Sequence, residues 1–123
     1  GGGLGALRPA VTREQVVALQ AVTDAVRFDP ALREYVVAIA NATRTHADLQ
    51  LGLSPRAGLA LAQAARATAV LAGRDYVIPE DITGNLPAVG AHRVIPRTTV
   101  GGSAIAAAER VLDEVLRTVP SPA

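Results

Sequence analysis

The run from Pro55 to Ala72 limits the fold more than any other part of the chain. Beyond Arg56 in its first turn it is nearly all Ala, Leu and Val, with Gln63, Arg66 and Thr68 as its polar exceptions. Ser54-Pro55 in front of it is a helix-start signal, and Gly73 behind it is a helix-stop signal. The pattern predicts a helix over about 55–72. Because this helix is apolar on most sides, we expect it to lie at the centre of the molecule.

Further start signals predict helices on either side of this central one. Thr12 and Gln15 form a capping-box pattern that opens a helix over about 13–25. Asp29-Pro30 opens a helix over about 30–45, and a last amphipathic helix runs from Ser103 to about residue 118. Apolar residues mark all three helices, at spacings of three and four in the second and in an amphipathic pattern in the last: Val16, Val17, Leu19, Ala21, Val22; Leu32, Tyr35, Val36, Ile39, Ala40; Ile105, Val111, Leu112, Val115, Leu116.

The remaining segments are short. Tyr76–Ile78 reads as an extended piece, Pro79-Glu80-Asp81 opens a short fourth helix, and residues 93–102 read as a loop. Residues 1–11, rich in glycine, are expected to be a linker or an expression remnant, and 120–123 a tail. The predicted fold is all-α: a small bundle of about five helices with at most a minimal strand pair.

Composition excludes several functions. The chain has 123 residues, about one domain, and no cysteine, so it has no disulfide, thiol nucleophile or thiolate metal site. All 12 basic residues are arginine, which excludes a P-loop and Schiff-base chemistry because both need lysine. A net charge of +1 gives no argument for binding nucleic acid or a membrane surface. No apolar run is long enough to span a membrane and no signal peptide is evident, so we expect a cytoplasmic protein.

Arg56 stands near the second position of the predicted central helix. The helix dipole disfavours a cation there by about 0.3–1 kcal/mol. The unpaired backbone N–H groups of a helix start bind anions, so a phosphate between them and the guanidinium would make the position favourable. The alternative is an exposed or core-flanking arginine that pairs with a nearby carboxylate. Position alone does not decide between the two.

The two histidines give weaker signals. His46 and Asp48 lack a second imidazole at ligand spacing, so we expect a polar loop and no metal site. His92-Arg93 is typical of a capping or packing pair at a helix end. No nucleophile–base arrangement is recognisable, and no basic stripe with stacking aromatics suggests a nucleic-acid partner.

Three stretches together resemble the C-terminal lid domain of the MoxR family of AAA+ ATPases, over about Leu7 to Val119. They are "YVVAIANATRTHADLQ", "LGLSPRAGLALAQAARATAVLAGRDYVIPEDI" and "AHRV". The chain departs from the family pattern at Ile78, where the family tends to place a Ser or Thr helix cap, and at Gly90-Ala91. The resemblance implies that residues 12–119 form an AAA+ helical lid. The lid of the magnesium-chelatase ATPase subunits is similar and stays an alternative.

The resemblance also implies a function for Ser54, Pro55 and Arg56. In the family the arginine of this "SPR" motif is the sensor-2 residue, which reaches the γ-phosphate of ATP bound in the preceding α/β domain. The parent protein is then expected to be an ATPase that uses ATP and Mg²⁺. The present chain has no Walker A or Walker B motif, so we expect it to be inactive alone and to hold no cofactor tightly.

Partners are likewise implied by the resemblance. They are the preceding AAA+ nucleotide-binding domain, neighbouring subunits in a hexameric ring, and a von Willebrand factor A domain protein, in chaperone-like work on other complexes. No nucleic-acid partner and no membrane span are expected. The alternative from another class is a stand-alone helical interaction or DNA-binding module.

Overall fold

The computed structural model describes residues 12–122, so the linker predicted over 1–11 lies outside the described residues. The elements follow one another as α2 (Arg13–Asp24), α3 (Pro30–Arg44), β1 (Leu49–Leu51), α4 (Pro55–Leu71), α5 (Pro79–Thr83), α6 (Leu86–Gly90), β2 (Ile95–Pro96) and α7 (Ala104–Thr118). The prediction of a small all-α bundle with a minimal strand pair is confirmed.

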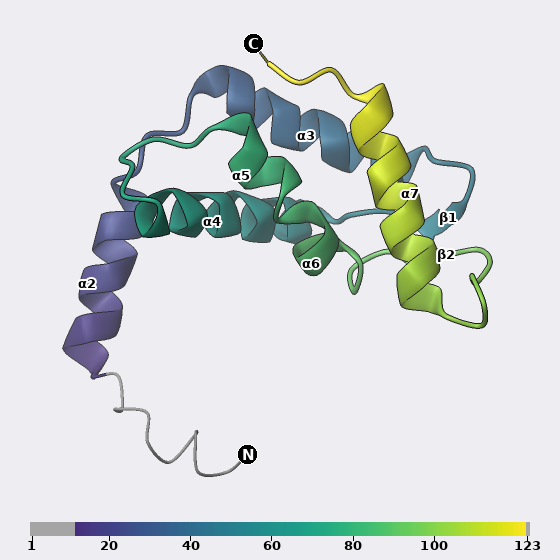
Figure 1. Ribbon diagram of the computed structural model, residues 1–123, viewed down its shortest axis with the longest axis horizontal. Coiled ribbons are helices and arrows are strands. Elements are labelled where there is room, and N and C mark those ends of the chain that lie inside the picture. The colour runs from purple at the N-terminus through teal and green to yellow at the C-terminus, as the bar shows by residue number, and fades with distance from the viewer. Residues whose placement is uncertain (1–11, 123) are drawn as a thin grey trace.

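Helix α4 is the centre of the bundle, as its apolar composition predicts. It packs against α2, α3, α5 and α6. Figure 1 shows α3 running alongside α4, while α7 crosses near the end of α3 and packs against α3 and α6. Its buried face is a stripe of residues spaced by four: Ala57, Leu61, Ala65 and Ala69. Small alanine side chains let the neighbouring helices approach closely, because they hold backbones apart less than larger side chains do.

The predicted helix starts are confirmed. Thr12 and Gln15 form a capping box: the Gln15 N–H donates to Thr12 Oγ1 over 3.1 Å, and the Thr12 N–H donates to Gln15 Oε1 over 2.8 Å. Asp29 accepts from the Ala31 N–H, and Ser103 accepts from the Ala106 N–H. These bonds span two or three residues, so local sequence is sufficient to specify them.

The strand pair lies where the sequence suggested loops. Strand β1 pairs with β2 in antiparallel register, Leu49 opposite Pro96 and Leu51 opposite Ile95. The segment expected to be extended, Tyr76–Ile78, forms only an isolated bridge with Arg27. In this bridge the Val77 N–H donates to the Arg27 carbonyl over 3.0 Å.

Helix α2 forms as predicted, but the apolar residues that follow its capping box are not part of the core. None of its residues is buried, and Val16, Val17, Leu19 and Val22 are 43–59% exposed. Figure 1 shows the helix leaving the body of the domain beyond one end of α4. Periodicity reports which side of a helix is apolar but not what covers that side. Ile105, at the start of α7, is also exposed, whereas Val111, Leu112 and Val115 are buried as predicted.

The predicted fourth helix comes as two short ones, α5 and α6, because the chain turns between them at Gly84 and Asn85. The Asn85 side-chain Nδ2 donates to Thr68 Oγ1 over 2.8 Å and to the Asp81 carbonyl over 2.7 Å. The bond to Thr68 fastens the turn to α4, and the bond to Asp81 closes the end of α5. Ile82 and Leu86, one from each short helix, are fully buried.

Candidate functional site

The first turn of α4 presents Arg56 to solvent. Ser54 is the N-cap, and its Oγ accepts from the Ala57 N–H over 3.2 Å. Pro55 occupies the first helical position, where its missing N–H costs no hydrogen bond. Arg56 follows and is exposed, and within residues 12–122 it takes part in no ion pair. The alternative of an arginine that pairs with a nearby carboxylate therefore has no partner among the described residues.

The loop in front of this turn is held by two side chains from the end of α3. Thr43, fully buried, accepts from the Leu53 N–H over 2.9 Å and donates to the Ala40 carbonyl over 2.6 Å. The neighbouring Arg44 donates its Nε to the Leu53 carbonyl over 2.7 Å. Both backbone polar groups of Leu53 are thus bound by side chains, which fixes the chain one residue before the helix cap. The "ATRTH" stretch is therefore a structural support for Arg56.

Gly52 completes this support through close backbone approach. A Cβ on Gly52 would lie 2.6 Å from the Arg44 nitrogen and 2.6 Å from the Thr43 carbonyl carbon. Only a residue without a side chain allows the loop to lie this close to the end of α3. The spacing of "ATRTH" and "LGLSPR" in the sequence reflects this contact.

Arginines from three parts of the chain line a hollow beside Arg56. The hollow has a volume of about 550 Å³, and its lining includes Arg44, Arg56 and Arg93 but no Asp or Glu. Arg93 donates to the Val89 carbonyl over 2.7 Å, so the prediction that it caps a helix end is confirmed. Each guanidinium carries five donor hydrogens, and these bonds leave donors free in all three. The hollow is therefore electropositive and suits an anion.

Sequence reasoning found Ser54, Pro55 and Arg56 but missed Arg44 and Arg93 as neighbours of the same hollow. Arg44 ends one helix and Arg93 follows another, so their meeting depends on tertiary packing. The available signal was the presence of both arginines within the stretches that carry the family resemblance, "ATRTH" and "AHRV".

The stretch "GRDYVIPEDI" builds the far end of α4. Gly73 adopts a left-handed φ of 76°, and a pair of bonds closes the helix: Gly73 N–H to the Val70 carbonyl and Arg74 N–H to the Ala69 carbonyl, each 2.9 Å. This is a Schellman motif, in which the left-handed position is usually a glycine. The predicted helix stop at Gly73 is confirmed.

Arg74 then clamps the start of α5. Its guanidinium donates two bonds to the buried Asp81 carboxylate, over 2.7 and 2.8 Å. Asp81 also accepts from the Ile78 N–H over 2.9 Å, so it caps a helix whose N-cap residue has no polar side chain. Burial alone raises the pKa of Asp81, but the bonds from Arg74 and Ile78 outweigh it and hold this pKa below its ordinary value. The same hydrogen bond raises the pKa of the Arg74 guanidinium above its ordinary value.

His46, Asp48 and Glu114 come together as a cluster whose ligand atoms lie within 4.8 Å of one another. His46 Nδ1 accepts from the Asp48 N–H over 3.0 Å, and His46 Nε2 lies 3.6 Å from Glu114. Because Nδ1 accepts, the neutral ring carries its proton on Nε2, which then faces Glu114 as a donor. In this tautomer the one ring-nitrogen lone pair, on Nδ1, is already engaged by the Asp48 N–H. The geometry supports the expectation of a polar loop.

Comparison with known proteins decides the family. The AAA lid domain family matches residues 41–115, which is 75 of the 123 residues. The chain belongs to the AAA+ lid domains of the MoxR family. The matched range contains Thr43, Gly52, Arg56 and the Arg74–Asp81 clamp, so the site and its supports all lie in the lid.

Named relatives agree with this assignment. The lid is 39% identical over 116 residues to the Bacillus subtilis protein YeaC, covering 94% of the lid chain and 36% of that protein. It is 39% identical over 101 residues to the chaperone MoxR1 of Mycobacterium tuberculosis, covering 75% of the chain and 26% of that protein. A crystal structure of a protein described as an ATPase of Cytophaga hutchinsonii superposes with a TM-score of 0.78 at 26% identity, over 89% of the lid chain and 36% of that chain.

The MoxR lid thus spans between about a quarter and a little over a third of the length of these proteins. Within residues 12–122, no helix combines the length and the apolar character that crossing a membrane requires.

Proposed function

We propose that this lid carries the sensor-2 residue of a MoxR-type AAA+ ATPase, and that this residue is Arg56. The observation that carries the proposal is the hollow at the start of α4. It holds three arginines and no carboxylate in its lining, beside a helix start whose N–H groups favour an anion. Ser54 and Pro55 contribute by fixing the direction of the first turn. The match of this turn to the family's "SPR" motif suggests which anion binds there, namely the γ-phosphate of ATP.

The residues present fit a phosphate but not a divalent cation. Guanidinium groups bind phosphate oxygens through charge-assisted, two-pronged hydrogen bonds. Mg²⁺ prefers carboxylate oxygens, and the lining of the hollow has none. In the parent protein, we therefore expect the nucleotide-binding domain to hold Mg²⁺ and the phosphate cradle, while the lid contributes Arg56. The lid alone would not hydrolyse ATP.

The rigid mounting of Arg56 suggests how nucleotide state becomes movement. Thr43 and Arg44 fasten the Leu53 backbone to α3, and Arg56 belongs to the helix that packs against most of the bundle. A pull on the guanidinium would therefore move the lid as one body. Contact with the γ-phosphate would hold the lid closed, and loss of that phosphate would release it.

The wider setting of the parent protein follows from the family. We expect a cytoplasmic hexameric ring in which lids pass their movement to neighbouring subunits. One relative is named a chaperone, MoxR1 of M. tuberculosis. We accordingly propose chaperone-like work on partner complexes, with a von Willebrand factor A domain protein among the partners.

Steady-state ATP hydrolysis by the parent protein tests the proposal. Arg56→Ala should lower the rate by about tenfold or more, because a charge-assisted contact to the transferred phosphate is lost. Arg56→Lys should recover little of it, since an ammonium does not reproduce the planar fork. The melting temperature of the lid should not fall in either variant, because Arg56 is exposed and has no ion-pair partner within residues 12–122.

Arg117→Ala is the matched control. Arg117 is an exposed arginine near the C-terminal end of α7, paired only with Asp113 one turn earlier. Its removal should leave hydrolysis unchanged. Equal rates in Arg56→Ala and the unmodified protein, or equal losses in Arg56→Ala and Arg117→Ala, would contradict a sensor-2 role.

A further inference from the structure

A second surface lies along the neighbouring helices α3 and α4 and reaches the first turn of α4, where Pro55 and Gly58 line it. It is a groove of about 700 Å³. We call it the α3–α4 groove, and its lining includes the apolar residues Phe28, Val36, Val37, Ala40, Leu59 and Ala62. Val37 and Leu59 are 57% and 70% exposed, so the groove offers large apolar side chains to water. Phe28, Val36 and Ala40 are buried beneath them. Large exposed apolar side chains over an apolar hollow are typical of a protein docking site.

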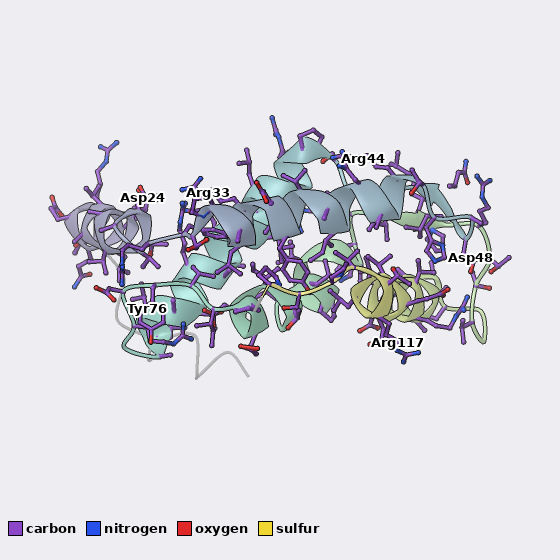
Figure 2. All side chains as sticks on the ribbon, turned by 90° about the horizontal axis from the view of Figure 1, so that it is seen from above. Asp24, Arg33, Arg44, Asp48, Tyr76 and Arg117 are labelled. Atoms are coloured by element: carbon purple, nitrogen blue, oxygen red, sulfur yellow. The ribbon has the colours of Figure 1, made fainter. Side chains whose placement is uncertain are left out.

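The polar residues of the groove carry a strong excess of positive charge. Arg33, Arg44 and Arg66 line it, against one acidic residue, Asp24. Asp24 already accepts a hydrogen bond from Gln63. Figure 2 labels Arg33 and Arg44 near opposite ends of α3. An occupant that complements this surface is therefore apolar in the middle and acidic at its edges.

Arg66 has guanidinium N–H donors without a hydrogen-bond acceptor among residues 12–122. Its Nε is buried and has no hydrogen-bond partner among residues 12–122, while its guanidinium lies over the Phe28 ring at 5.2 Å from the centroid. Arg33 lies over the same ring at 5.4 Å. The Arg66 Nη1 donates to Gln63 Oε1 over 2.9 Å, which leaves further terminal N–H donors of the guanidinium for an acceptor in the groove. A carboxylate would supply it.

We propose that the α3–α4 groove binds an amphipathic helix of a partner protein, with an apolar face flanked by Asp or Glu. Two adjacent helices leave a furrow between them that a third helix can fill. Arg33 and Arg44 are 11 residues apart on α3, about 16 Å along the helix axis. The partner helix is accordingly about three turns long and has carboxylates near both ends. Arg44 and Pro55 also belong to the Arg56 site, but Arg56 itself does not line this groove, so peptide binding and ATP sensing can be tested with separate variants.

Two synthetic peptides of about 15 residues test this with the 123-residue chain. Both have the same leucine face at helical spacing, and the flanking positions are Glu in one and Lys in the other. Fluorescence anisotropy should show the Glu peptide binding at least about tenfold more tightly, with an affinity that falls as salt rises. Arg33→Glu combined with Arg66→Glu should reverse the preference.

Leucine substitutions on the same helix locate the binding site. Leu59→Asp should abolish binding of the Glu peptide without lowering the melting temperature, because Leu59 is largely exposed. Leu71→Asp is the matched control, since Leu71 is 89% exposed on α4 and does not line the groove. It should leave binding unchanged.

Three outcomes would overturn the proposal. The first is equal affinity for the two peptides, or an equal loss in both leucine variants. The second is self-association of the chain in light scattering that Leu59→Asp removes, which would make a second copy the occupant. The third is failure of the parent protein to bind a Glu peptide that the lid chain binds, which would mean that another part of the parent covers the groove.

Discussion

Thr43→Val removes a hydroxyl that joins two distant parts of the lid. The side chain is fully buried, and its Oγ1 accepts from the Leu53 N–H and donates to the Ala40 carbonyl. Valine keeps the branched shape but offers no acceptor. The Leu53 N–H, on a residue that is 1% exposed, is then buried without a partner.

The cost can be worked from these contacts. Leaving one buried donor unsatisfied destabilises a protein by about 1–3 kcal/mol. For a domain of this size, each kcal/mol lowers the melting temperature by roughly 4 °C, so we expect a fall of roughly 4–12 °C. Amide hydrogen exchange should locate the effect, because the Leu53 amide should lose protection beyond the global loss.

Thr23→Val is the matched control. Thr23 Oγ1 donates to the Leu19 carbonyl over 2.9 Å in the exposed helix α2, and no N–H depends on it. Its loss should change the free energy of unfolding by less than about 0.5 kcal/mol. If Thr43→Val melted within error of the unmodified chain and the Leu53 amide kept its protection, the account of how the "SPR" turn is held would be wrong.

Further predictions concern the glycines and the buried ion pair. Gly52→Ala should destabilise the lid by about 1–3 kcal/mol in chemical denaturation, because the new methyl lies 2.6 Å from backbone atoms. Gly58→Ala should instead stabilise it by about 0.5–1 kcal/mol, since that Cβ has no neighbour closer than 3.9 Å in a helix interior. Asp81→Asn should cost about 1.5–3 kcal/mol at pH 7 by weakening the bonds from Arg74. Because the folded pKa of Asp81 is lowered, its contribution is complete above the unfolded pKa of about 3.9 and is lost as pH falls through the folded value, so the two unfolding curves should approach each other as pH falls below about 4. A gap as wide at pH 2 as at pH 7 would contradict this.

Features set by a few neighbouring residues were predictable from the sequence. The caps at Thr12, Asp29, Ser54 and Ser103 use bonds across two or three residues. The glycine stop after α4 is equally local. Such signals position the helices, and the apolar composition of α4 is enough to place it at the centre.

Features that depend on distant segments were not predictable in the same way. Strand β1 pairs with β2, which lies more than 40 residues later in the sequence. A strand of three residues is too short for its alternation of apolar and polar residues to predict it. The capping box and apolar residues of α2 correctly predict a helix, yet those apolar residues are exposed in this chain. What covers a helix is a property of the whole assembly and not of its own spacing.

The candidate site likewise contains one residue that the sequence predicts and two that only the folded structure reveals. Arg56 stood out because a cation in a first helical turn is locally unfavourable, and the family resemblance supplied a reason for it. Arg44 and Arg93 gave no local anomaly, because one ends a helix and the other caps one, as basic residues commonly do. Their convergence with Arg56 required the folded structure.

Nucleotide binding to the parent protein tests the central claim most directly. The affinities for ATP and for ADP are measured by calorimetry with Mg²⁺, in the unmodified protein and in Arg56→Ala. If Arg56 contacts the γ-phosphate, the variant should bind ATP about tenfold more weakly and ADP with unchanged affinity, because only ATP carries that phosphate. Equal losses for both nucleotides, or no loss for either, would contradict the assignment of Arg56 as the residue through which this lid senses ATP.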